Sequence, residues 1–539
     1  MSKTYKADVI IVGAGVAGSL TAWKLAQQKF RVLVLESGPR VDRKQAVAVY
    51  RGTMDKSPES PYSAIPHAPR PETRNLQSYY VQSGPDLFKS TYERRVGGTT
   101  WHWLGETPRF MPNDFYLHST YGRGIDWPLN YEDLESWYNE AEQHLGVSGE
   151  RYPHSSIPRT SSYPLPPIPG TYLDRQVALA AQRVGIAVEL TPQARNSLTY
   201  DSRPPCCGSA SCIPICPVGA KYDASVHAKK AEELGVQILD NAVASFVRID
   251  SKGQVSGIQF VRDDGSRHWA TGRLYVIAAH AIETPKLLLM SRTASLPNGV
   301  SNSSNQVGRN LMDHPIQLSW ALADDPLYPY RGPLATSGIE QFRDGTYRRE
   351  HGAYRIKISN EGWAWPVGDP SHTALQYIQQ GIRGRALVDA LNYRVSRELH
   401  LASLVEQLPH PDNRITPAFD LLDSVGMPRP KIHWQVGDYT LKGMAQSQEV
   451  HEKIFKALGT SERHHSNSYE GAGHIMGTYR MGMDAKESVV DPNLRSHDHP
   501  NLFLLGSGVF PTSGTANPTL TIAALSLRTA QVIAKNLFP

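Results

Sequence analysis

The chain has 539 residues, of which 56 are Lys or Arg and 51 are Asp or Glu, so its formal net charge is only +5. A charge this small on a chain this long argues against a nucleic-acid-binding protein. Hydrophobic residues make up 40% and charged residues 20%, which excludes a disordered chain and predicts a globular protein with a large core. We expect two interwoven domains, because α/β enzymes of this length often combine two.

The first segment has the pattern of a nucleotide-binding unit. Its order is strand, glycine turn, helix, strand and acid, carried by 7–12, Gly13, Gly15, Gly18, a helical stretch through Leu25, 32–35 and Glu36. The glycines allow a tight turn, admit a pyrophosphate to the backbone and let the helix pack closely. Glu36 stands where an acceptor for a ribose hydroxyl is expected. Because its carboxylate would repel a 2′-phosphate, the pattern predicts FAD or NAD rather than NADP.

Longer stretches of the chain follow. The proline-dense segments 58–71 and 153–169 preclude long helices and central strands, so we expect ordered surface excursions. Apolar residues recur with a helical period over 131–145 and predict a packing helix. The region from about 317 to 462 mixes possible strands with a helical stretch and carries no motif; we expect a substrate-facing sheet and a lid. The last block, 501–539, predicts a strand at its start, a glycine turn and an amphipathic helix from 518 to about 537.

All four cysteines, Cys206, Cys207, Cys212 and Cys216, lie within eleven residues of one another. A disulfide framework would spread cysteines along the chain, so the clustering indicates a metal or iron–sulfur site. The spacing from Cys212 to Cys216 and the following proline matches the end of the bacterial ferredoxin motif. Adjacent residues seldom both point at one cluster, so we expect Cys206, Cys212 and Cys216 as ligands, with Cys207 spare or exchanging with Cys206. A structural zinc site and a disulfide are the alternatives.

No stretch approaches the ~18 consecutive apolar residues that a membrane helix needs. The first twenty residues superficially resemble a secretory signal, but Asp8 and the glycine spacing fit a nucleotide-binding unit better. No twin-Arg pair precedes the apolar stretch. We therefore predict no cleaved targeting peptide, so that any export would depend on a partner.

Further segments carry a family resemblance: Arg95–Trp103, Ala278–Pro285, Val307–Pro315 and the C-terminal block. They resemble the glucose-methanol-choline (GMC) oxidoreductases, FAD enzymes that oxidise alcohol groups, in the expected order from residue 8 to about residue 530. The resemblance implies an α/β fold: a Rossmann-like FAD-binding domain, similar to p-hydroxybenzoate hydroxylase, interwoven with an α+β substrate domain on an antiparallel sheet. We expect the FAD-binding domain to comprise 1–50, 88–112, 200–316 and 465–539, and the substrate domain with its surface excursions 51–87, 113–199 and 317–464.

The resemblance also implies cofactor contacts beyond the first glycine turn, namely Gly97, Gly98, Thr100, His102, Val243, Ala279, Gly508, Pro518 and Thr519. His102 occupies the place where related sugar oxidases join a histidine covalently to the flavin. Other family members bind FAD without that bond, so both a covalent and a non-covalent FAD are open.

Alcohol oxidation by a flavin needs a base for the hydroxyl proton, and histidine suits that step. The chain has 20 histidines, so residue type alone selects none. Gly473–Gly482 resembles the family segment that carries the base, which selects His474, and the second catalytic position falls on Asn517. Asn517 would hold the substrate hydroxyl, with capping of the helix after it as a further role. The segment containing His314 supports the flavin domain in the family, so we do not expect His314 to be catalytic.

Within the family, Gly97–Trp103, the cysteine loop 203–220 and Ile282–Leu288 resemble the large flavoprotein subunits of bacterial membrane-bound sugar dehydrogenases. Those subunits oxidise gluconate, 2-ketogluconate, fructose, sorbitol or glucose and carry a three-iron [3Fe-4S] cluster. They work with a small export or chaperone-like subunit and a membrane-anchored cytochrome c subunit. The resemblance thus implies a location at the periplasmic face of the inner membrane, whereas composition alone would equally allow the cytoplasm.

The leading hypothesis is an FAD-dependent sugar or sugar-acid dehydrogenase that passes electrons through the cluster to a cytochrome-type acceptor. The segments around His474 and Asn517 look slightly more like gluconate-type than glucose-type enzymes. One alternative is a sugar oxidase similar to pyranose oxidase, which makes hydrogen peroxide and has little need for a cluster. Others are a non-catalytic electron-transfer or scaffold subunit, which should lack His474 and Asn517, and an NAD-dependent dehydrogenase, which should bind no yellow chromophore.

Overall fold

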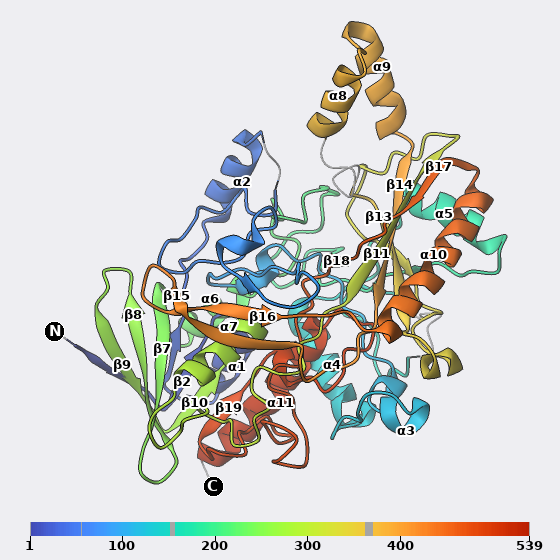
Figure 1. Cartoon of the computed structure of the whole chain (residues 1–539). Helices are drawn as coiled ribbons and strands as arrows, with labels where there is room; N and C mark the ends of the chain where they lie inside the picture. The colour runs from blue at the N-terminus through green and yellow to red at the C-terminus, as the bar shows by residue number, and fades with distance from the viewer. Residues whose placement is uncertain (1, 55–56, 151–156, 362–369, 538–539) are drawn as a thin grey trace.

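The computed structural model describes residues 2–54, 57–150, 157–361 and 370–537. A five-stranded parallel sheet lies at the centre of the nucleotide-binding part (Figure 1). Its strands run in the order β19 (Leu502–Leu504), β10 (Leu274–Ile277), β2 (Val9–Val12), β3 (Val32–Leu35) and β6 (Gln237–Leu239). Every residue of β2, β3, β10 and β19 is buried. Such continuous burial is typical of a parallel sheet that is covered on both faces.

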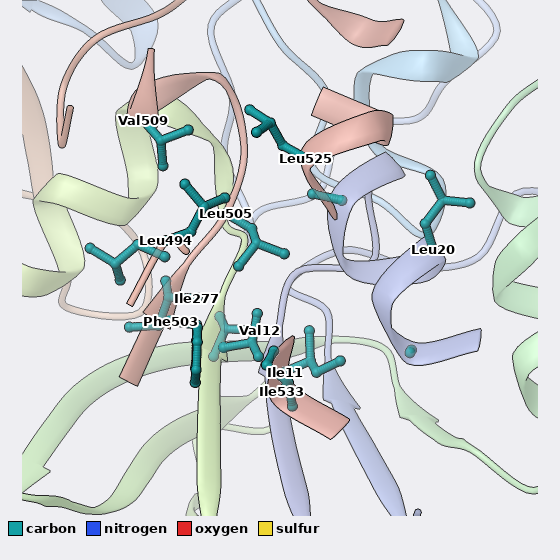
Figure 2. Close-up of a cluster of buried hydrophobic side chains, with 14 of the residues drawn as sticks. Ile11, Val12, Leu20, Ile277, Leu494, Phe503, Leu505, Val509, Leu525 and Ile533 are labelled. Carbon is teal, nitrogen blue, oxygen red and sulfur yellow. The ribbon is translucent and has the colours of Figure 1, made fainter. Parts of the chain in front are cut away.

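Helices from both ends of the chain pack together beside this sheet. α1 (Val16–Gln27) packs against α6 (Ser225–Glu233) and α11 (Thr519–Leu537), and α4 (Tyr131–Leu145) packs on α11. Side chains of β2, β10, α1 and α11 meet in one buried cluster that includes Val12, Ile277, Leu20 and Leu525 (Figure 2). This packing places α11, the last helix in the chain, beside α1, which begins at the first glycine turn.

A second layer on the nucleotide-binding side is a four-stranded sheet in the order β1-β9-β8-β7. Its strands are β1 (Thr4–Lys6), β7 (Ala242–Ile249), β8 (Val255–Arg262) and β9 (Arg267–Thr271). β7, β8 and β9 pair antiparallel, and β1 adds parallel to β9. α7 (His280–Met290) follows β10 and contacts β7.

The largest sheet has seven strands, all paired antiparallel. In order they are β17 (Thr460–His465), β11 (Pro315–Ala323), β14 (Glu398–Val405), β13 (Tyr354–Ser359), β12 (Ser337–Ile339) and β5 (Glu189–Leu190), with β18 (Glu470–Gly471) also on β11. α10 (Asp438–Leu458) covers one face of this sheet and packs on α5 (Tyr172–Gln182) (Figure 1). The opposite face borders the cavity described below.

The remaining elements surround these sheets. A three-stranded sheet joins β15 (Arg414–Leu422), β16 (Pro428–His433) and β4 (Val81–Gln82) beside α7, and α2 (Arg43–Gly52) and α3 (Leu117–Tyr121) are short surface helices. α8 (Pro370–Gln379) and α9 (Gly384–Val395) form a helical hairpin that projects from the body (Figure 1). Single 3₁₀ turns span Leu76–Ser78, Gly98–Trp101, Pro112–Asp114, Thr346–Arg349 and Ser507–Val509.

The predicted fold class is confirmed, since a parallel nucleotide-binding sheet is joined to an antiparallel sheet. The strand at 32–35 and the helix at 131–145 have the predicted bounds. Residues 58–71 contain no helix or strand, and neither do 157–169; residues 151–156 lie outside the described residues. No helix in the described ranges is long and apolar enough to cross a membrane.

The division into two domains remains a proposal. All strands of the parallel sheet fall within the ranges expected for the FAD-binding domain. β18 (Glu470–Gly471) falls there as well, although it pairs with β11 of the seven-stranded sheet.

Candidate active site

A cavity of about 1180 Å³ runs from the first glycine turn to the face of the seven-stranded sheet. Gly13, Gly15 and Glu36 line this cavity, and so do His474 and Asn517. The space is large enough for a dinucleotide together with a small substrate, because ordinary ligand pockets measure roughly 300–1,000 Å³.

The three glycines of the first turn have different structural roles. A Cβ atom on Gly13 would lie 2.4 Å from the Ala278 carbonyl oxygen, and one on Gly18 would lie 1.9 Å from the Gly13 carbonyl oxygen. A Cβ on Gly15 would meet nothing within 4 Å. Gly15 also caps α1 without a side-chain hydrogen bond, and the first turn of α1 has no acidic residue. Free N–H groups therefore face open space, which fits the pyrophosphate of FAD.

Glu36 follows β3 and is almost fully buried. One carboxylate oxygen accepts from the Ala14 N–H at 2.8 Å, and the other accepts from the Gly38 N–H at 3.0 Å. These bonds brace the glycine turn against the end of β3. The Oε1 atom that accepts from Gly38 also accepts from the Ser37 hydroxyl at 3.1 Å. Oε2, which accepts from Ala14, has a second lone pair, so Glu36 can also accept from a ribose hydroxyl.

Most of the other predicted cofactor contacts also line the cavity: Gly98, Thr100, His102, Val243, Ala279, Pro518 and Thr519. Gly18, Gly97 and Gly508 do not line it. Gly97 has φ +100° and lies against the Trp101 indole, and a Cβ on Gly508 would lie 2.0 Å from the Tyr479 ring. The structure thus places Gly97 and Gly508 behind the cavity wall, where close packing requires glycine.

His102 lies beside a buried carboxylate. Its Nδ1 is 3.6 Å from a carboxylate oxygen of Glu93, which also pairs with Arg70 and Arg95. Burial alone would raise the pKa of Glu93, but the contact with His102 and the two guanidinium charges lower it to about 2. An ionised Glu93 favours a proton on Nδ1 of His102, which leaves the other ring nitrogen free. The covalent bond between His102 and the flavin stays a prediction.

We accordingly predict that acid precipitation of the wild-type protein leaves the yellow colour in the pellet. In His102→Ala the colour should pass to the supernatant, because the nitrogen that forms the bond is gone. Release of all colour from the wild-type protein would contradict the covalent bond.

His474 contacts two side chains from distant segments. Its Nδ1 is 2.9 Å from Nδ1 of His314, and its Nε2 is 3.2 Å from Nδ2 of Asn517. Burial lowers the pKa of His474 well below its usual value, and the charges of Arg355 and Lys357 contribute. The imidazole is therefore neutral at pH 7 and able to accept a proton.

Asn517 stands two residues before the start of α11 and is buried. Its amide nitrogen faces His474, whereas its Oδ1 is buried without a hydrogen-bond partner among the described residues. The helix-capping role is not seen, because a cap would use Oδ1 to accept an N–H of α11. A buried acceptor without a partner in a cavity wall fits a ligand hydroxyl.

The sequence did not reveal a group of charged residues in the wall of this cavity. Lys357 donates to Glu361 at 2.7 Å, and Arg355 pairs with Glu106 and, at 2.6 Å, with Glu340. Lys357, Glu361 and Glu106 line the cavity. Arg355 and Lys357 are alternate residues of β13, so they share one face of the strand. Alternation over so few residues, in a region without a motif, gave no signal that could have found them.

The cysteine loop borders the same cavity through Ala210, Ile213 and Pro214. Cys212 and Cys216 are buried, Cys206 is half-buried and Cys207 is exposed, and all four thiols are free. The N–H groups of Gly208 and Lys221 lie 3.4 and 3.5 Å from the sulfurs of Cys206 and Cys216. Nevertheless, no group of three or more His, Cys, Asp or Glu residues in the described ranges is arranged to hold a metal ion. The iron–sulfur cluster stays a prediction.

Lys221 fastens the cysteine loop to the cavity wall. Its buried ammonium donates to the carbonyl oxygens of Trp101 and Cys212 at 2.9 and 2.8 Å, and to that of Trp103. Burial lowers the pKa of Lys221 to about 8. The ammonium still carries its charge at pH 7, so it holds the loop beside His102.

Fold and cavity together define an FAD-dependent oxidoreductase, and the family comparisons agree. Residues 8–297 match the model of FAD dependent oxidoreductases, and residues 409–526 match that of GMC oxidoreductases. The chain belongs to the GMC oxidoreductase family.

Individual relatives cover the whole chain. The fructose dehydrogenase large subunit of Gluconobacter japonicus is 39% identical and covers 99% of each chain. The gluconate 2-dehydrogenase flavoprotein of Pantoea cypripedii is 25% identical, and the match covers 98% of this chain and 93% of that one. The crystal structure of pyridoxine 4-oxidase from Mesorbium loti has a TM-score of 0.64 at 18% identity, covering 97% of this chain and 98% of that one. This last likeness supports the fold alone.

Proposed function

We propose that the protein is a sugar dehydrogenase that oxidises a hydroxyl of a neutral sugar. The observation that carries the proposal is the pair formed by Nε2 of His474 and the unpartnered Oδ1 of Asn517 in a cavity continuous with the nucleotide-binding end. When bound, FAD would accept a hydride from the carbinol carbon. His474 would take the hydroxyl proton on Nε2, and the amide nitrogen of Asn517 would then donate to the hydroxyl oxygen and hold the group in place.

The charges in the cavity wall favour a neutral substrate over a sugar acid. Lys357 is already paired with Glu361, and Glu106 with Arg355. A substrate carboxylate that paired with Lys357 would have to displace Glu361, whereas sugar hydroxyls can donate to Glu361 and accept from Lys357 together. The 39% identity to a fructose dehydrogenase subunit, against 25% to a gluconate 2-dehydrogenase flavoprotein, supports the same preference. We therefore propose fructose as the first substrate to test.

We further propose that Cys206, Cys212 and Cys216 hold a [3Fe-4S] cluster and that the electron acceptor is a cytochrome. Support comes from the position of the cysteine loop on the cavity wall and from the N–H groups directed at two of its sulfurs. The name of the fructose dehydrogenase relative, a large subunit, supports an assembly with further subunits. In our proposal these are a small subunit and a membrane-anchored cytochrome c subunit at the periplasmic face of the inner membrane.

Anaerobic addition of single sugars to the purified protein tests the proposed substrate class. Fructose should bleach the flavin absorption rapidly, and gluconate and 2-ketogluconate should bleach it slowly or not at all, with glucose and sorbitol as neutral comparisons. Faster bleaching by gluconate would contradict the neutral-sugar proposal. Rapid reoxidation by oxygen with stoichiometric hydrogen peroxide would favour the oxidase alternative.

A further inference from the structure

His314 is fully buried immediately before β11, and both its ring nitrogens have partners. Its Nε2 lies 3.0 Å from the carbonyl oxygen of Gly514 and 3.3 Å from that of Ser513. Carbonyl oxygens only accept hydrogen bonds, so Nε2 of His314 must carry a proton.

The other nitrogen of His314 is then an acceptor. Burial lowers the pKa of His314 to about 4, although the two carbonyl oxygens act in the opposite direction. A neutral imidazole has one proton, and that proton is on Nε2, so Nδ1 of His314 is bare. This bare nitrogen is the one that lies 2.9 Å from Nδ1 of His474.

The proton between the two rings consequently belongs to His474. Since His474 is also neutral, its proton on Nδ1 leaves Nε2 bare, and Nε2 accepts from the Asn517 amide at 3.2 Å. Donation thus runs in one direction, from Asn517 through His474 and His314 to the Gly514 carbonyl oxygen.

We infer that His314 is a positioning residue that fixes the tautomer of His474, so that Nε2 is the nitrogen that receives the substrate proton. The inference deepens the proposed function and rests on it. In the reaction the substrate hydroxyl would replace the Asn517 amide as the hydrogen-bond partner of Nε2 and transfer its proton there, while the proton on Nδ1 stays and continues to donate to His314. A neutral acceptor behind the base can stabilise the imidazolium that forms, as the carboxylate does behind the histidine of a serine protease.

The carboxylate of Asp313 holds the backbone of both histidines in the His314–His474 contact. Oδ1 of Asp313 accepts from the N–H groups of His314 and His474 at 2.8 and 2.9 Å, and its other oxygen accepts from Ser90. The two rings lie nearly perpendicular, at 86°. Further charges act on the pair from neighbouring elements: Arg355 and Lys357 of β13 on His474, and Arg343 and Glu406 on His314.

Two near-isosteric substitutions test the two ring nitrogens of His314 separately, because each keeps the hydrogen-bonding role of only one of them. His314→Asn places an amide oxygen near the position of Nδ1 and keeps an acceptor for His474. His314→Gln extends its amide toward the position of Nε2, so it keeps the donor to Gly514 and loses the acceptor. We expect His314→Gln to reduce sugar-driven flavin reduction about 10–100-fold with little change in KM, and His314→Asn to retain most of the rate.

A second measurement detects the tautomer of His474 independently of enzyme activity. In a proton NMR spectrum of the wild-type protein, the buried Nδ1–H of His474 should give a downfield resonance. This resonance should be lost in His474→Asn and His314→Gln and retained in His314→Asn. Bound flavin and melting temperature, measured for each variant, identify any that fails to fold.

The outcomes separate this inference from the proposed function. Equal losses in His314→Asn and His314→Gln, with flavin bound, would overturn the inference, because they would indicate a role in packing alone. An unchanged rate in His314→Gln would overturn it as well, provided that His474→Ala is inactive. If His474→Ala itself remains active, the result contradicts the proposed function rather than the role of His314.

Discussion

Replacing His474 by alanine should reduce the rate of anaerobic flavin reduction by sugar about 10²–10⁴-fold, because the hydroxyl proton loses its acceptor. The flavin should remain bound, since the glycine turn and Glu36, which also line the cavity, are untouched. Stopped-flow absorbance at the flavin band measures the rate directly. His118→Ala is the matched control, because His118 is exposed on α3 and does not line the cavity.

The pH dependence of the wild-type rate checks the same assignment. The pKa of His474 lies well below the usual histidine value, and the base works only in its neutral form. The rate should thus be constant above neutral pH and fall only as the pH drops through that lowered pKa. A rate that rises on acidification, or near-native turnover in His474→Ala, would contradict a role as the base.

Replacing Cys212 by serine should remove iron and acid-labile sulfide from the protein, since a buried ligand of the proposed cluster is lost. Sugar should still reduce the flavin, because His474 and Asn517 are untouched, but electron transfer to a cytochrome should fall to the background rate. Elemental analysis and cytochrome reduction measure the two effects separately.

Cys207→Ser is the matched control for this substitution. Cys207 lies in the same loop, but its thiol is exposed, so iron content and cytochrome reduction should both remain. Unchanged iron in Cys212→Ser would contradict the proposed ligands. Loss of iron in Cys207→Ser with retention in Cys206→Ser would exchange the roles of these two neighbours, and wild-type protein without iron would exclude the cluster.

The nucleotide-binding unit was predictable because its determinants are local in the sequence. The glycine turn, Glu36 and the flanking apolar runs follow one another within a single strand–helix–strand unit, and the structure has them in that order. The helix at 131–145 was predictable for the same reason, since a helical period of apolar residues specifies the buried face without reference to other segments.

The sequence by itself therefore determined the fold class, the nucleotide-binding turn and, through family resemblance, His474 and Asn517 as candidates. Tertiary structure alone decided which ring nitrogen of His474 faces Asn517 and which faces His314, because these residues come from three segments that only folding brings together. It likewise decided that Lys357 and Glu361 line the same cavity as His474. The physical reason is that pairing of β11 with β14, and of β14 with β13, sets these positions, and long-range strand pairing leaves no local pattern in the sequence.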